Sequence, residues 1–78
     1  MNLSQFIKDF AAEFEMTEPE EIKAETSYRD LDEWDSLLGL AIIGMAKNKY
    51  NVKISVEEIR NAKTVENLFN LVMSKQTH

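Results

Sequence analysis

The feature that most limits the fold is the spacing of the apolar residues, which recur at three- and four-residue intervals through most of the chain. Near the start, this spacing places five apolar side chains on one helical face: Leu3, Phe6, Ile7, Phe10 and Phe14. Strand signals are few, because the β-branched runs are short and no Asn-Gly or Asp-Gly hairpin turn occurs. The sequence therefore predicts an all-helical protein whose first helix covers about residues 2–15.

The length and the residue types set further limits. A chain of 78 residues builds a single core, since only about 60% of the surface of so short a chain is buried on folding. We expect one domain over residues 1–78. The sequence has no cysteine, so it has no disulfide framework and no zinc-ligand set. We find no signal-peptide pattern and no apolar run long enough to span a membrane, and we expect a cytoplasmic, monomeric protein.

The remaining elements follow from helix stop and start signals. Pro19 ends the first helical pattern, and residues 16–35 form a long loop that single apolar residues are expected to anchor: Ile22, Tyr28, Leu31 and Trp34. A second helix is predicted over about residues 36–50 and a short third one from the Ser55–Glu58 capping box to about Asn61. Thr64 is expected to cap the last helix, and residues 75–78 to form a polar tail. This order is typical of a small four-helix up-down bundle with a long loop between its first two helices.

The second predicted helix carries apolar residues around much of its circumference. We assign one stripe to the core, widened by Ile42 and Leu38: Leu37, Leu40, Ile43, Ala46 and Tyr50. On the other side, Leu38, Ala41 and Met45 form a strip that we predict to be exposed and to dock partner proteins, with Trp34 before it. Gly39 and Gly44 each cost roughly 1 kcal/mol relative to alanine in a helix, which suggests a close approach of another group to the backbone there.

Charge is divided unevenly between the two halves of the chain. Residues 1–35 hold eleven of the fourteen acidic residues and three basic ones, for a net charge of −8, whereas residues 36–78 have a net charge of +3. Binding to nucleic acid needs a dense basic face, which a total charge of −5 does not favour. We expect instead a protein partner with a basic patch.

The junction between the acidic loop and the second helix holds Ser36, the main candidate for chemistry. A serine nucleophile needs a nearby base, and the only histidine is the last residue of the chain, His78. The sequence also lacks a nucleophile elbow and a phosphate-binding glycine-rich loop, so we expect no enzymatic activity. Residues 30–41 begin like a calcium-binding loop, but Trp34, Asp35 and Ala41 stand where ligand, glycine and glutamate belong, and we expect no metal site.

Two interpretations of Ser36 are open from its position alone. Either Asp35 or Ser36 is suited to cap the helix, because the side-chain oxygen of each can accept a hydrogen bond from a first-turn amide. Alternatively, a hydroxyl exposed at the start of a helix is a suitable place for a phosphodiester, because the amides and the helix dipole favour negative charge.

The order of these motifs resembles the acyl carrier protein family. The resemblance rests on Asp35-Ser36-Leu37 near the middle of the chain, on Leu31 in the loop before it, and on two later segments: Val52-x-Ile54-Ser55 and Lys63-Thr64-Val65-x-x-Leu68. It implies a four-helix carrier whose Ser36 bears 4′-phosphopantetheine, transferred from coenzyme A by a separate phosphopantetheinyl transferase that recognises Asp35 and Leu37. It also implies acyl groups carried as thioesters and partners that load and process them.

Two finer questions stay open. Carriers of fatty-acid synthesis are usually acidic on the exposed face of this helix, whereas this chain has Lys47 and Lys49 there. We therefore prefer a specialised lipid, polyketide or related pathway to general fatty acid biosynthesis. The alternatives are an aminoacyl or peptidyl carrier, and a helical interaction module that is never modified.

Overall fold

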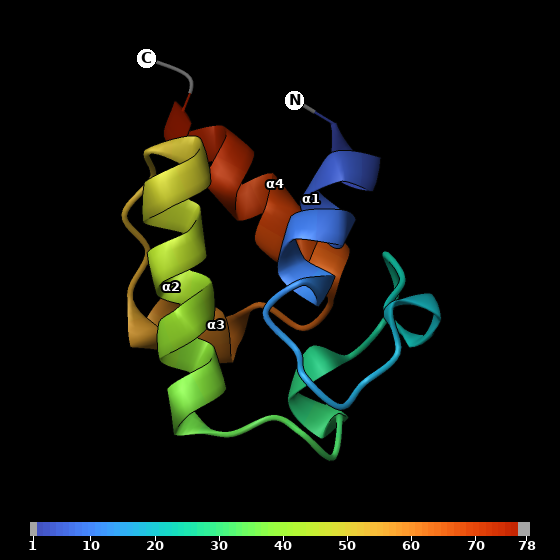
Figure 1. Cartoon of the computed structure of the whole chain (residues 1–78). Helices are drawn as coiled ribbons and strands as arrows, with labels where there is room; N and C mark the ends of the chain where they lie inside the picture. The colour runs from blue at the N-terminus through green and yellow to red at the C-terminus, as the bar shows by residue number, and fades with distance from the viewer. Residues whose placement is uncertain (1, 77–78) are drawn as a thin grey trace.

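The computed structural model describes residues 2–76, and this part of the chain is helical with no strand. Four α-helices follow one another: α1 (Leu3–Ala11), α2 (Ser36–Tyr50), α3 (Val56–Asn61) and α4 (Val65–Gln76). Figure 1 shows α1, α2 and α4 around a common core, with the short α3 behind the lower half of α2 and the long α1–α2 connection entering α2 at its lower end. The predicted small helical bundle is confirmed.

The helices begin where the sequence signals place them. Asn2 caps α1 by accepting from the amide of Gln5, and Ser55 and Glu58 form the expected capping box at α3. At α4 the hydroxyl of Thr64 accepts from the amide of Asn67 at 3.1 Å. α1 ends earlier than predicted, with Ala12 as its C-cap.

The C-terminal end of α2 matches the prediction, whereas α4 extends further than predicted. Asn51 ends α2 in the left-handed conformation with φ 55°, which asparagine tolerates better than most residues. Lys75 and Gln76 belong to α4 and not to a polar tail: the Lys75 ammonium donates to the Glu58 carboxylate at 2.8 Å and the Gln76 amide donates to the Tyr50 carbonyl at 2.7 Å. Residues 77 and 78 lie outside the described residues.

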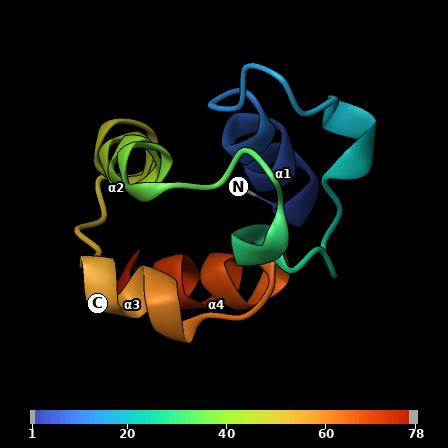
Figure 2. The ribbon, with the colours of Figure 1, turned by 90° about the horizontal axis from the view of Figure 1, so that it is seen from below.

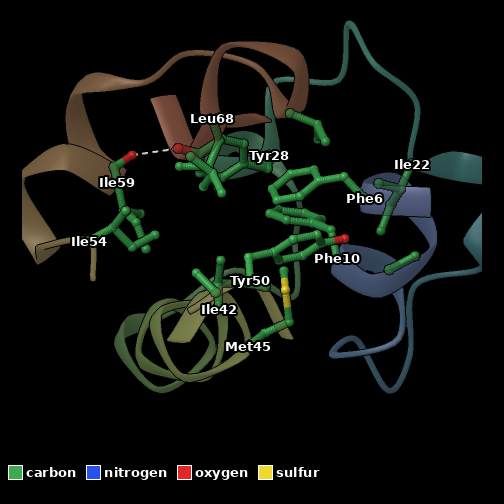
Figure 3. Packing of buried hydrophobic residues seen from close by; sticks show 14 of the residues in the cluster. Phe6, Phe10, Ile22, Tyr28, Ile42, Met45, Tyr50, Ile54, Ile59 and Leu68 are labelled. Atoms are coloured by element: carbon green, nitrogen blue, oxygen red, sulfur yellow. Dashed lines mark hydrogen bonds between the residues drawn. The ribbon is translucent and has the colours of Figure 1, made fainter. Parts of the chain in front are cut away.

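The core is built from all four helices and the long loop. Phe6 and Phe10 of α1 are fully buried beside Ile42 of α2 and Leu68 of α4, and Figure 3 shows these side chains pointing toward one another. The loop contributes Ile22 and Tyr28, which are also buried. The prediction that single apolar residues anchor the loop is therefore confirmed, with Leu31 and Trp34 partly buried against the same core.

Tyr28 fixes the loop to α3. It lies in a short 3-10 turn (Tyr28–Asp30), and its buried hydroxyl donates to the carbonyl of Ile59 at 2.6 Å (Figure 3). The same hydroxyl lies 3.1 Å from the carbonyl of Ala62, which also accepts from it. Two further loop carbonyls, those of Ala24 and Thr26, accept from first-turn amides of α4. The loop is thus hydrogen-bonded to both α3 and α4. None of the helices in residues 2–76 is long and apolar enough to cross a membrane.

Candidate functional site: a serine at the start of α2

The first turn of α2 decides which residue caps the helix. The backbone of Asp35 is extended, and its Oδ1 accepts from the amide of Leu38 at 2.8 Å. Ser36 is the first helical residue, its side chain is exposed, and its hydroxyl takes part in none of the hydrogen bonds within residues 2–76. Capping therefore belongs to Asp35 alone, and the Ser36 hydroxyl has no structural role in the first turn.

Glu33 holds the loop that precedes the serine. Its Oε1 accepts from the amides of Met16 at 2.9 Å and Thr17 at 2.8 Å and from the Thr17 hydroxyl, while its Oε2 accepts from the amide of Glu15 at 2.6 Å. These bonds, first of all the one from Glu15, hold the pKa of the Glu33 carboxyl below its usual value. Glu33 thus ties the loop before Ser36 to the backbone that follows α1.

Trp34 forms the wall between this loop and α2. Its ring centroid lies 4.9 Å from that of Tyr28 and 6.4 Å from that of Phe14, and the indole faces Gly39 of α2. A Cβ at Gly39 would lie 3.6 Å from the indole, an ordinary contact, and a Cβ at Gly44 would meet no atom within 4 Å. The expected close approach is therefore limited to Trp34 at Gly39 and is wrong for Gly44. Trp34 is half-buried, so a docking role for its accessible edge stays a prediction.

A groove opens beside the serine, between the start of α2, the loop and α3. Its volume is about 440 Å³, and Figure 2 views the molecule from the end at which it lies. Apolar side chains from three elements form most of its lining, and polar groups stand among them. The lining residues are Arg29, Trp34, Asp35, Ser36, Gly39, Leu40, Ile43, Val56, Ile59 and Arg60.

The exposed side of α2 is not the one that the sequence pattern indicated. Leu38 and Met45 of the predicted docking strip are 8% and 3% exposed and pack in the core, and Ala41 is partly buried against it. Leu37 and Leu40, which we had placed in the core, are 76% and 55% exposed. The predicted strip is therefore wrong: the helix is turned so that Leu37 and Leu40 face outward.

This error has a physical cause. Between residues 37 and 46, α2 is apolar on nearly every side, so its own periodicity does not select a buried face. The choice is made by packing, because α1, α3 and α4 all contact α2, and together they cover the side that carries Ile42 and Met45. The assignments of Ile42, Ala46 and Tyr50 to the core are confirmed.

The electrostatics at the start of α2 suit an anion on the serine oxygen. First-turn amides of a helix have no acceptor within the helix, and here only that of Leu38 is taken by a cap. The amides of Ser36 and Leu37 remain at the positive end of the helix dipole, which lowers the energy of a nearby phosphate.

A comparison with protein families identifies the family of the chain. A family model described as a phosphopantetheine attachment site matches residues 5–72. The chain belongs to this family. No curated protein and no solved structure matches the chain.

Membership gives the cofactor and the general role. A phosphopantetheine attachment domain bears 4′-phosphopantetheine covalently and serves the enzymes that modify and process what the arm carries, without catalysis of its own. The residues present fit the group, because an exposed hydroxyl with no structural partner stands at the mouth of an apolar groove, beside unpaired amides.

Sequence reasoning located Ser36, Asp35 and Leu37, which lie together at this end of α2. It did not predict that Arg29 and α3 line the groove beside Ser36, or that Glu33 holds the loop before this serine. None of them carries a local signal, because Arg29 and Arg60 are 31 positions apart in the sequence and Glu33 lies in a run of other acidic residues.

Proposed function

We propose that this chain is an acyl carrier protein in which Ser36 is the residue that receives 4′-phosphopantetheine. The observation that carries the proposal is the state of the Ser36 hydroxyl, which is exposed and free of hydrogen bonds because Asp35 supplies the cap. A serine that served only as a cap would instead have its oxygen on a first-turn amide. When bound, the arm supplies a thiol on which acyl groups are carried as thioesters.

In this proposal the chain's own residues position the serine and present it. Glu33 and Trp34 hold the incoming loop, and Asp35 fixes the first turn, so the serine oxygen points out of the fold at a constant place. Leu37, 76% exposed, offers the transferase an apolar contact next to the reacting oxygen. The Asp35 carboxylate offers a negative charge to a basic residue of the transferase, and attraction of that kind raises the rate of encounter.

The pathway and the partners are part of the proposal. Lys47 and Lys49 are exposed on α2, whereas carriers of fatty-acid synthesis usually have an acidic docking face on this helix. This difference supports a specialised lipid or polyketide pathway over general fatty-acid synthesis. The partners are a phosphopantetheinyl transferase and the enzymes that load and process the acyl group. Because the transferase uses coenzyme A, we also propose a cytoplasmic location, with a monomer as the functional unit.

The decisive experiment is intact mass spectrometry of the purified protein after incubation with coenzyme A and a phosphopantetheinyl transferase. The wild type should gain the mass of one arm, and Ser36→Ala should gain none. Ser27→Ala is the matched control, since Ser27 is also exposed and its side chain caps nothing; it should be modified like the wild type. No gain in the wild type would leave the unmodified interaction module, and a gain in Ser36→Ala would place the arm elsewhere.

The kind of cargo is tested separately. The loaded protein is isolated from its producing cells and treated with hydroxylamine, which releases thioester-bound groups, and the released compound is identified by mass. An acyl hydroxamate without an amino group supports the acyl carrier. An aminoacyl or peptidyl hydroxamate would favour the runner-up function.

A further inference from the structure

The mostly apolar groove beside Ser36 has two cationic residues in its lining. The chain contains two arginines, Arg29 and Arg60, and both line this groove. None of the seven lysines contributes to its lining. The two arginines come from different elements, Arg29 from the turn before α2 and Arg60 from α3, so the tertiary fold alone brings them to one site.

The backbone at both arginines is held by a buried contact. Each arginine is the sequence neighbour of one partner in the hydrogen bond from the Tyr28 hydroxyl to the Ile59 carbonyl, which is 2.6 Å long. Both side chains are exposed, and neither forms an ion pair within residues 2–76, although the sequence has fourteen acidic residues. Both cations therefore line the groove without an ion pair to a carboxylate of residues 2–76.

The chemistry of arginine indicates which kind of group such a site would bind. A guanidinium presents several N–H donors in a planar fork that matches the oxygens of a phosphate or a carboxylate, which a lysine ammonium does not. The Asp35 carboxylate, which also lines the groove, already places a negative charge next to Ser36. A further anion at this place is disfavoured by Asp35 unless nearby cations offset the repulsion.

We propose that Arg29 and Arg60 bind an anionic group of the Ser36-linked arm and so hold the arm in the groove. The shared chemistry is an anionic phosphate or carboxylate oxygen, and it has two sources: the phosphodiester next to Ser36, or a carboxylate on the far end of the cargo. The apolar side chains of Leu40, Ile43 and Val56 would then contact the uncharged part of the arm. This inference rests on the proposed function, since it requires the arm on Ser36.

The test follows the arginine side chains by NMR, using their Nε–Hε signals in four samples that intact mass has first verified. The samples are the unmodified protein, the protein with the bare arm, and the protein loaded with a monocarboxylic or with a dicarboxylic acyl group of equal length. A shift of the arginine signals on addition of the bare arm supports binding of the phosphodiester. A shift that appears only with the dicarboxylic acyl group supports binding of the cargo carboxylate.

Variants separate binding by these arginines from a general effect of charge. In Arg29→Gln/Arg60→Gln, the shifts of the Leu40 and Ile43 methyl signals caused by the bound group should be largely lost. Lys63→Gln removes one positive charge at an exposed position outside the groove and should keep them. Raised salt should reduce the shifts in the wild type, because exposed charges are screened.

The outcomes distinguish the two levels of the argument. Mass gain at Ser36 with unchanged arginine signals in all loaded samples would overturn the binding role of Arg29 and Arg60 and leave the carrier function intact. Equal loss of the methyl shifts in Lys63→Gln would also overturn it, since the effect would then come from net charge. Failure of the wild type to gain the arm would overturn the proposed function and this inference together.

Discussion

The carboxylate of Glu33 accepts a hydrogen bond from the amide of Thr17 at 2.8 Å. Thr17 follows the end of α1 and Glu33 stands three residues before Ser36, so this contact joins two segments that are 16 positions apart. The same carboxylate also accepts from the amides of Glu15 and Met16. The placement of Ser36 therefore depends on a carboxylate three residues before it in the loop.

This arrangement predicts a dependence of stability on pH. The folded-state pKa of Glu33 is lowered, so its stabilising contribution is present above the unfolded pKa, about 4.3, and is lost as pH falls through the folded pKa. Glu33→Gln should melt at a lower temperature than the wild type at neutral pH and should lose less on acidification. Melting temperature measured from neutral to acid pH checks this.

Asp32→Asn is the matched control for Glu33→Gln. Asp32 is exposed and takes part in no hydrogen bond within residues 2–76. The melting temperature of Asp32→Asn should therefore stay close to that of the wild type at each pH. Glu58, whose pKa is also lowered, chiefly by the Lys75 ammonium, will leave part of the acid sensitivity in both variants. A Glu33→Gln protein as acid-sensitive as the wild type would refute the role of the carboxylate.

Asp35→Asn should separate the cap from the charge. Asparagine caps about as well as aspartate, so the free energy of unfolding should change by only a few tenths of a kcal/mol, whereas Asp35→Ala should lose about 1 kcal/mol. Transfer of the arm to Asp35→Asn should be slower at low salt, and the difference should shrink at high salt. Equal modification rates at every ionic strength would show that the charge of Asp35 has no part in recognition.

Adjacent leucines at the start of α2 should behave in opposite ways. Leu38 is 8% exposed, and Leu38→Ala should cost about 2–5 kcal/mol in the free energy of unfolding, as expected for a core leucine. Leu37 is 76% exposed, and Leu37→Ala should change stability by no more than about 0.5 kcal/mol. Chemical denaturation of the two variants gives both values.

Leu37→Ala also tests the partner-facing side of α2. If Leu37 is a main contact of the transferase, its truncation should cost about 2 kcal/mol of docking free energy, measured as the loss in kcat/KM for modification per folded molecule. Unchanged kinetics would move the recognition surface to other exposed residues near Ser36, such as Leu40 and Val56.

Tyr28→Phe should loosen the contact between the loop and α3. The substitution leaves the carbonyl of buried Ile59 without its hydroxyl donor, and an unsatisfied buried group costs about 1–3 kcal/mol. Amide hydrogen exchange in α3 should become faster, while α1 changes less. If exchange rises equally in all helices, the hydroxyl contributes only to global stability.

The hydroxyl of Tyr28 also predicts a limit at high pH. Burial raises the pKa of Tyr28 to about 12, so the neutral form is favoured in the folded state. Its contribution is complete below the unfolded pKa, about 10, and is lost as pH rises toward 12. Tyr28→Phe should show a flatter loss of melting temperature over this range than the wild type.

Much of the fold was determined by local sequence. The spacing of Phe6, Phe10 and Phe14, the Ser55–Glu58 capping box and the cap at Thr64 act within one or two helical turns, so they could be identified without knowledge of the rest of the chain. The start of α2 follows in the same way from two adjacent residues suited to cap it, Asp35 and Ser36, although only the structure assigns the cap to Asp35.

Tertiary structure decided what local pattern left undetermined. Because α2 is apolar on nearly every side, only the packing of the other helices buries Leu38 and Met45 and exposes Leu37 and Leu40. The hydrogen bonds of Glu33 join segments at least 16 positions apart, and the groove is lined by both Arg29 and Arg60, which are 31 positions apart. Such contacts depend on where the loop and α3 are folded against α2, and no periodicity or cap in the sequence encodes that placement.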